Sequence, residues 1–130
     1  MISAIRLDGT TASLAIEGAT DTAVFRVYVE EILCPILKPD DIVIMDNLAA
    51  HKSPVTLELI EALGAQAWFL PAYSPDLNPI EKMWSKVKNQ LRSAEARSQE
   101  TLYTAIGEAI AQVTMRDAMN WFASCGYSFI

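Results

Sequence analysis

A strand–helix–strand run between residues 41 and 70 limits the folds open to this 130-residue chain more than any other feature. The short apolar run 42–45 follows two acids and predicts a buried strand. Capping, proline and glycine signals predict a helix at 54–63, and a second apolar stretch predicts a strand at 65–70. The helix and the second strand together bring the chain back beside the first strand.

The rest of the sequence adds a hairpin in front of this run and helices around it. Asp8-Gly9 is a signal for a hairpin with a two-residue turn, and helical spacing begins after Asp21. We expect one α/β domain over residues 1–130, with a mixed sheet and flanking helices. The predicted strands are 2–7, 11–17, 41–46 and 65–70, and the predicted helices are 21–37, 54–63, 79–91, 99–113 and 115–124.

Composition excludes several classes of protein. Apolar residues make up 52% of the chain and charged residues 20%, as in a globular domain rather than a disordered one. No apolar run approaches the roughly 20 residues that span a bilayer, and the N-terminus lacks the pattern of a signal peptide. Cys34 and Cys125 have no metal or redox spacing, so we expect reduced core residues in a cytoplasmic protein without a membrane partner. The three tryptophans, Trp68, Trp84 and Trp121, are also expected in the core.

The formal net charge of −6 argues against a dedicated nucleic-acid-binding domain. Half of the ten basic residues nevertheless fall in one stretch of the chain; these are Lys82, Lys86, Lys88, Arg92 and Arg97. A solvated helix face is one interpretation of this cluster, and a phosphate-binding surface is the other.

Asp46 stands at the tip of the predicted strand 41–46, and functional groups gather at such strand ends in open α/β sheets. An Asx turn, with Asn47 helping, would also account for an aspartate here. In a functional site, Asn47 would orient Asp46 by a hydrogen bond. His51, five residues further on, either arranges this loop and touches a phosphate or is an exposed loop histidine.

Glu81 lies in the first turn of a helix that is predicted to begin at Pro79. Asn78 and Glu81 form a capping-box pattern around Pro79, which explains Glu81 without any chemistry. A capping carboxylate can still face the edge of the sheet, so the two roles are compatible. The helix has an apolar side and a polar side, and the polar side carries Glu81, Ser85, Lys88 and Arg92.

The pairing of Asp46 with Glu81 favours a functional interpretation. Two oxygen ligands on adjacent elements, without a His/Cys cluster, suit Mg²⁺ or Mn²⁺ better than zinc. Such ions could clamp both oxygens of a phosphodiester displacement. The candidate DNA contacts lie on the same helix as Glu81; these are Lys82, Ser85, Lys88 and Arg92.

Two strings, VIMDNLAAHKS and LPAYSPDLNPIEKMWSKVK, resemble the DDE transposases of the mariner superfamily, in their bacterial insertion-sequence branch. Residues 47–80, 34 positions, separate Asp46 from Glu81, which is a spacing typical of that group. The similarity extends over essentially the whole chain, including EGATD and the terminal ASCGY. SPDLNPIE is the most specific string because its proline, asparagine and glutamate must all fall in register.

The resemblance implies a ribonuclease-H-like fold and metal-dependent DNA strand cleavage and strand transfer during transposition. It implies that Asp46 and Glu81 are the second and third catalytic acids, which hold two Mg²⁺ or Mn²⁺ ions in the complete enzyme. The implied partners are transposon ends and target DNA, so a cytoplasmic protein would associate with the nucleoid when bound to DNA.

The chain departs from the family pattern at the first catalytic aspartate. The family carries it on a strand before the hairpin, at the centre of the sheet, and neither Asp8 nor Glu17 occupies that place. We therefore expect the C-terminal part of a catalytic domain, left by a frameshift, an internal start or a split gene, with little or no cleavage on its own. The resulting unpaired strand edges favour a homodimer or pairing with an upstream transposase polypeptide. The alternative is a non-catalytic truncated transposase that binds the full-length enzyme and inhibits it.

Overall fold

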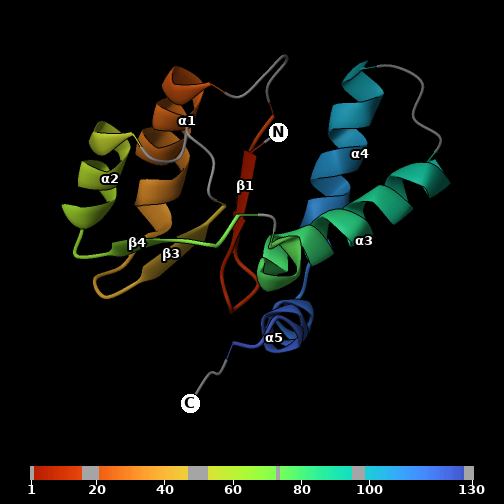
Figure 1. The fold of residues 1–130 in the computed structure, drawn as a ribbon. Helices are drawn as coiled ribbons and strands as arrows, with labels where there is room; N and C mark the ends of the chain where they lie inside the picture. The colour runs from red at the N-terminus through yellow and green to blue at the C-terminus, as the bar shows by residue number, and fades with distance from the viewer. Residues whose placement is uncertain (1, 16–20, 47–52, 73, 95–98, 128–130) are drawn as a thin grey trace. The chain divides into compact units, whose positions relative to one another are not determined.

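The computed structural model describes residues 2–15, 21–46, 53–72, 74–94 and 99–127 of the chain. The chain divides into two compact units (Figure 1). Unit 1 contains Met1–Ala4 and Ala12–Asn78, and unit 2 contains Ile5–Thr11 and Pro79–Ile130. Each unit is described below by itself.

Unit 1 is built on a β–α–β crossover. Strand β3 (Ile42–Met45) leads through helix α2 (Pro54–Glu61) to strand β4 (Gln66–Phe69), and the two strands pair in parallel. Helix α2 begins directly after Ser53, with proline as its first residue, although the Ser53 side chain makes no capping hydrogen bond. Gly64 follows the end of α2 with a φ of 81°, a conformation that glycine adopts without strain.

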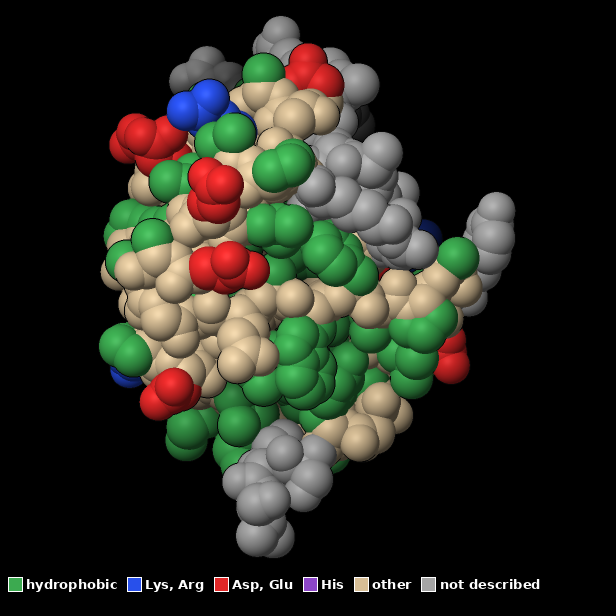
Figure 2. All heavy atoms as spheres, turned by 60° about the vertical axis from the view of Figure 1, so that its left-hand side comes forward, with side chains coloured by type: hydrophobic (Ala, Val, Ile, Leu, Met, Phe, Trp, Pro, Cys, Tyr) green, Lys and Arg blue, Asp and Glu red, His purple; other side chains and the backbone are tan. Residues whose placement is uncertain are grey.

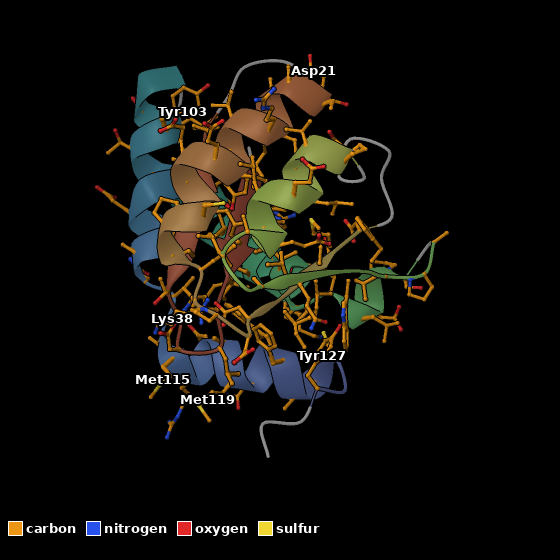
Figure 3. All side chains as sticks on the ribbon, turned by 90° about the vertical axis from the view of Figure 1, so that its left-hand side faces the viewer. Asp21, Lys38, Tyr103, Met115, Met119 and Tyr127 are labelled. Carbon is orange, nitrogen blue, oxygen red and sulfur yellow. The ribbon has the colours of Figure 1, made fainter. Side chains whose placement is uncertain are left out.

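The segment predicted as one helix over 21–37 changes its hydrogen-bond pattern twice. It begins as α1 (Thr22–Tyr28), where the Asp21 carboxylate accepts a hydrogen bond from the Val24 N–H at 2.9 Å (Figure 3). It continues as the π-helix η1 (Val29–Leu33) and ends as the 3₁₀-helix η2 (Cys34–Ile36). Pro35 explains the ending, because a residue without an N–H cannot continue α-helical hydrogen bonding.

The core of unit 1 lies between its helices and one face of the parallel strands. Helices α1 and α2 lie on the same side of β3 and β4 (Figure 1). The buried side chains of this core are Phe25, Tyr28, Val29, Leu33, Met45, Ile60 and Ala65. The Tyr28 hydroxyl donates a hydrogen bond to the carbonyl of Ala12 at 2.8 Å, and burial raises the pKa of Tyr28. This bond joins α1 to strand β2 (Thr11–Leu14).

The hairpin of β1 (Ile2–Ile5) and β2 has a three-residue loop, so the predicted two-residue turn is wrong. The Arg6 N–H bonds the Thr10 carbonyl at 2.8 Å, and the Gly9 N–H bonds the Arg6 carbonyl at 3.0 Å. A type I′ turn needs positive φ at both central residues, but here Gly9 alone has it, at 92°. The Asp8 carboxylate instead accepts a hydrogen bond from the Thr10 N–H at 2.8 Å.

The strands form two separate two-stranded sheets in the part of the chain that the structure describes. One is the hairpin pair β1–β2, and the other is the parallel pair β3–β4. Among the described residues, the pairing expected as one mixed sheet is therefore divided between two sheets, each with open edges.

Unit 2 is helical apart from the hairpin turn. Its helices are α3 (Pro79–Ala94), α4 (Gln99–Ala111) and α5 (Met115–Ser124). Its buried core consists of Met83, Val87 and Ala109, with Trp84 and Trp121 among the half-buried side chains that pack against it. Among the described helices, none is both long and apolar enough to span a bilayer.

A polar contact fastens α3 to the start of α5. Thr114 and Asp117 form a capping box, in which the Asp117 N–H donates to the Thr114 hydroxyl at 3.0 Å. The Lys86 ammonium forms an ion pair with Asp117 and donates to the Gln112 carbonyl at 3.1 Å. The hydrogen bond from Lys86 is the main cause that lowers the pKa of Asp117. Lys86 is therefore a structural cation within unit 2.

Candidate metal and DNA site

Asp46 follows strand β3 directly and is half-buried. Its Oδ1 accepts a hydrogen bond from the side-chain amide of Asn78 at 3.0 Å. Asn78 is only 7% exposed, so this bond is shielded from water and restrains the rotation of the carboxylate. The contact joins residues that lie 32 positions apart in the sequence.

The loop before α3 has a local structure that presents Asn78. Residues Pro75–Leu77 form the 3₁₀-helix η4, in which the Asn78 N–H donates to the Pro75 carbonyl at 3.1 Å. Asn78 itself is extended, with φ −113° and ψ 105°, as expected for a residue that precedes a proline. Two prolines therefore fix the backbone on both sides of the amide that holds Asp46.

Glu81 lies in the first turn of α3 and is exposed. Ser85, Lys88 and Arg92 are exposed too, and spacings of four, three and four residues put them on the same side of the helix as Glu81. The Ser85 hydroxyl donates to the Glu81 carbonyl at 3.3 Å, and Arg92 contacts Asn89 at 3.5 Å. Two cations thus extend along the helix from the carboxylate.

Lys82 differs from the other candidate DNA contacts. It is half-buried and follows Glu81 immediately, so it lies about 100° around the helix from the side that carries Lys88 and Arg92. We therefore give Lys82 less weight as a DNA contact than Lys88 and Arg92.

Two candidate residues, Asn47 and His51, lie outside the described part of the chain. Trp68 corrects the expectation that all three tryptophans are in the core, since 55% of its surface is exposed. The alternation of residues along β4 indicates this exposure. Ala67 and Phe69 pack against the core, so Gln66 and Trp68 point to the other side of the strand.

The donor atoms of the candidate site fit a hard divalent cation in part. Asp46 and Glu81 offer carboxylate oxygens, and Asn78 holds Oδ1 of Asp46 by its hydrogen bond. Within the described ranges, no group of three or more His, Cys, Asp or Glu side chains is arranged to hold a metal ion.

Comparison with known protein families matches residues 1–103 to the DDE superfamily endonucleases. That match covers most of the chain and includes both Asp46 and Glu81. The chain belongs to the DDE superfamily endonuclease family. No curated protein matches it.

Membership of the DDE superfamily endonucleases accounts for the architecture. The small sheets and the five α-helices of the described residues agree with the ribonuclease-H-like α/β fold of this family. The family acts on DNA and uses divalent metal ions, so a carboxylate site on this fold is the expected kind of centre. The resemblance read from SPDLNPIE is thereby confirmed at the level of the family.

Proposed function

We propose that this chain is the catalytic part of a transposase that cleaves and joins DNA strands with Mg²⁺ or Mn²⁺. Asp46 and Glu81 are the metal ligands in this proposal, and a pair of ions completes the enzyme. The observation that carries it is the hydrogen bond from Asn78 to Asp46, because it fastens the chain just before α3 to the first carboxylate.

Chain length supports the pairing of the two carboxylates. Glu81 follows Asn78 by three residues, and three residues span at most about 11 Å even when fully extended. Asn78 contacts Asp46 directly. The length of chain between them therefore allows both carboxylates to hold the same ions, as the proposal requires.

Each side chain has a separate task in the proposed reaction. Bound divalent ions supply Lewis acidity at the scissile phosphodiester. Asp46 supplies a carboxylate at the end of β3, and Asn78 restrains that carboxylate through the hydrogen bond to Oδ1. Lys88 and Arg92 bind phosphates of the DNA strand and orient it along α3, while Ser85 adds a neutral donor.

Isothermal titration calorimetry of the full chain with Mn²⁺ tests this proposal. We expect saturable binding that weakens at least about 10-fold in Asp46→Asn and in Glu81→Gln, and about 10-fold in Asn78→Ala, which removes the orienting hydrogen bond. Asp76→Asn is the matched control, because it removes an exposed carboxylate from the same loop and should leave binding unchanged.

Two results would contradict the assignment. One is undiminished binding in both Asp46→Asn and Glu81→Gln, which would place the ion elsewhere. The other is no binding by the wild-type chain. In that case the non-catalytic alternative, a partner that inhibits the full-length transposase, would be the better proposal.

We also infer that the chain pairs with a second polypeptide, either another copy or an upstream transposase segment. The open edges of the two small sheets support this, because isolated two-stranded sheets are marginally stable and unpaired edges invite a further strand. In this proposal the added strand brings a further carboxylate to Asp46. Light scattering of the purified chain distinguishes the two versions, since a strict monomer would contradict pairing between copies.

A further inference from the structure

Trp68 is an exposed aromatic side chain on the strand next to Asp46. Hydrophobic side chains occupy much of the face shown in Figure 2. The large exposed ones in the described part of unit 1 are Val27, Ile42, Val55, Leu63, Trp68 and Leu77. Trp68 is the aromatic member of this set and, at 55%, the most exposed.

Strand alternation puts Trp68 on the same side of the sheet as Asp46. Val43 and Met45 contribute to the core between the sheet and the helices, so Ile44 and then Asp46 alternate to the opposite side. Trp68 pairs with Ile44 in the parallel register, and it therefore also lies on that opposite side. Ile44 precedes Asp46 by two residues, which is about 7 Å along a strand.

The polar atom of the indole already has a partner. The Trp68 Nε1–H donates to the Gln66 side-chain carbonyl at 3.3 Å. What the residue still offers is the flat aromatic ring, which suits stacking rather than hydrogen bonding. Nucleobases stack on such rings without regard to their sequence, at about 1–3 kcal/mol per base.

We propose that Trp68 stacks against an unpaired nucleobase beside the phosphate that is handled at Asp46. The inference rests on the proposed function, because it takes the Asp46 side of the sheet as the side that faces DNA. Trp68 lies beside Ile44, two residues before Asp46. Its ring is therefore close enough to the carboxylate to hold a base of the reacting nucleotide or of its neighbour. Trp68 then fixes the position of the end of the DNA strand, while the basic side chains along α3 bind its phosphates.

Fluorescence anisotropy with two labelled oligonucleotides of equal length tests this role. One is a short single strand of thymidines, and the other has the same phosphates with abasic sugars. We expect the wild-type chain to bind the thymidine strand about 5- to 150-fold more tightly than the abasic strand, the equivalent of the stacking free energy. Trp68→Ala should bind both strands equally, and Trp68→Phe should restore most of the preference.

Two comparison variants separate stacking from other effects. Ile42→Ala removes another exposed apolar side chain from the same strand pair and should leave the preference intact. Lys88→Ala should weaken binding of both strands alike and reduce the salt dependence by about one phosphate contact. Thermal melts of all variants check that each one folds.

Equal binding of the two strands by the wild-type chain, or an unchanged preference in Trp68→Ala, would overturn the stacking role. Neither result would touch the metal assignment, which the Mn²⁺ titration tests separately. Absence of DNA binding would overturn both stacking and the DNA contacts of α3.

Discussion

Gly9→Ala is expected to lower the free energy of unfolding by about 3 kcal/mol. Two costs add at this position of the hairpin loop. Gly9 has a φ of 92°, where an L-residue is strained, and a methyl group on it would lie 2.8 Å from the Met115 backbone nitrogen. Backbone atoms at the start of α5 cannot rotate away as a side chain can. Denaturant unfolding followed by circular dichroism measures the effect.

Substitutions at two other glycines separate the cost of backbone strain from the cost of the steric clash. Gly126 has a φ of 94° but open space around it, so Gly126→Ala should cost only the backbone strain, about 1 kcal/mol. Gly107 lies within α4 with nothing near its added methyl group, so Gly107→Ala should stabilise by about 0.5–1 kcal/mol. Equal effects at Gly9 and Gly126 would show that the loop does not pack tightly on α5.

Met115 and Met119, one turn apart on α5, help to locate this region in Figure 3.

Ile60→Ala is expected to destabilise the protein by about 3 kcal/mol, and Ile60→Val by about 1 kcal/mol. Ile60 is fully buried in α2 and belongs to the same core cluster as Met45, the last residue of β3. Removing its side chain leaves a cavity in the core cluster that also contains Met45. Denaturant melts of both variants give the free energies, and the slope of the unfolding curve should stay unchanged.

Thr56 provides the matched control in the same helix. It is as buried as Ile60, and its hydroxyl makes no hydrogen bond to any residue that the structure describes. Thr56→Val keeps the volume nearly constant and removes an unsatisfied polar atom, so it should stabilise by about 1 kcal/mol. A loss of stability in Thr56→Val comparable with that in Ile60→Ala would mean that α2 tolerates no change and that the cavity explanation is wrong.

The sequence predicts a structural feature correctly where the atoms that form it belong to residues close together in the chain. Asp21 caps α1 through a residue three positions away, and Gly64 ends α2 next to its last turn. The apolar stripe of α3 follows from helical periodicity, and the family assignment follows from SPDLNPIE. The length of the hairpin loop was missed because Asp8-Gly9 suits more than one turn, and the Thr10 N–H selects among them.

The sequence by itself determined the strand–helix–strand order of residues 41–70, the family and the residues that bear the candidate chemistry. Only the tertiary structure decided what these residues contact: Asn78 bonds Asp46, Lys86 is paired with Asp117, and Trp68 is exposed. The physical reason is distance along the chain. Helix caps, turns and periodicity depend on neighbours within a few residues, whereas these contacts join residues about thirty positions apart or depend on which face of a sheet the helices cover.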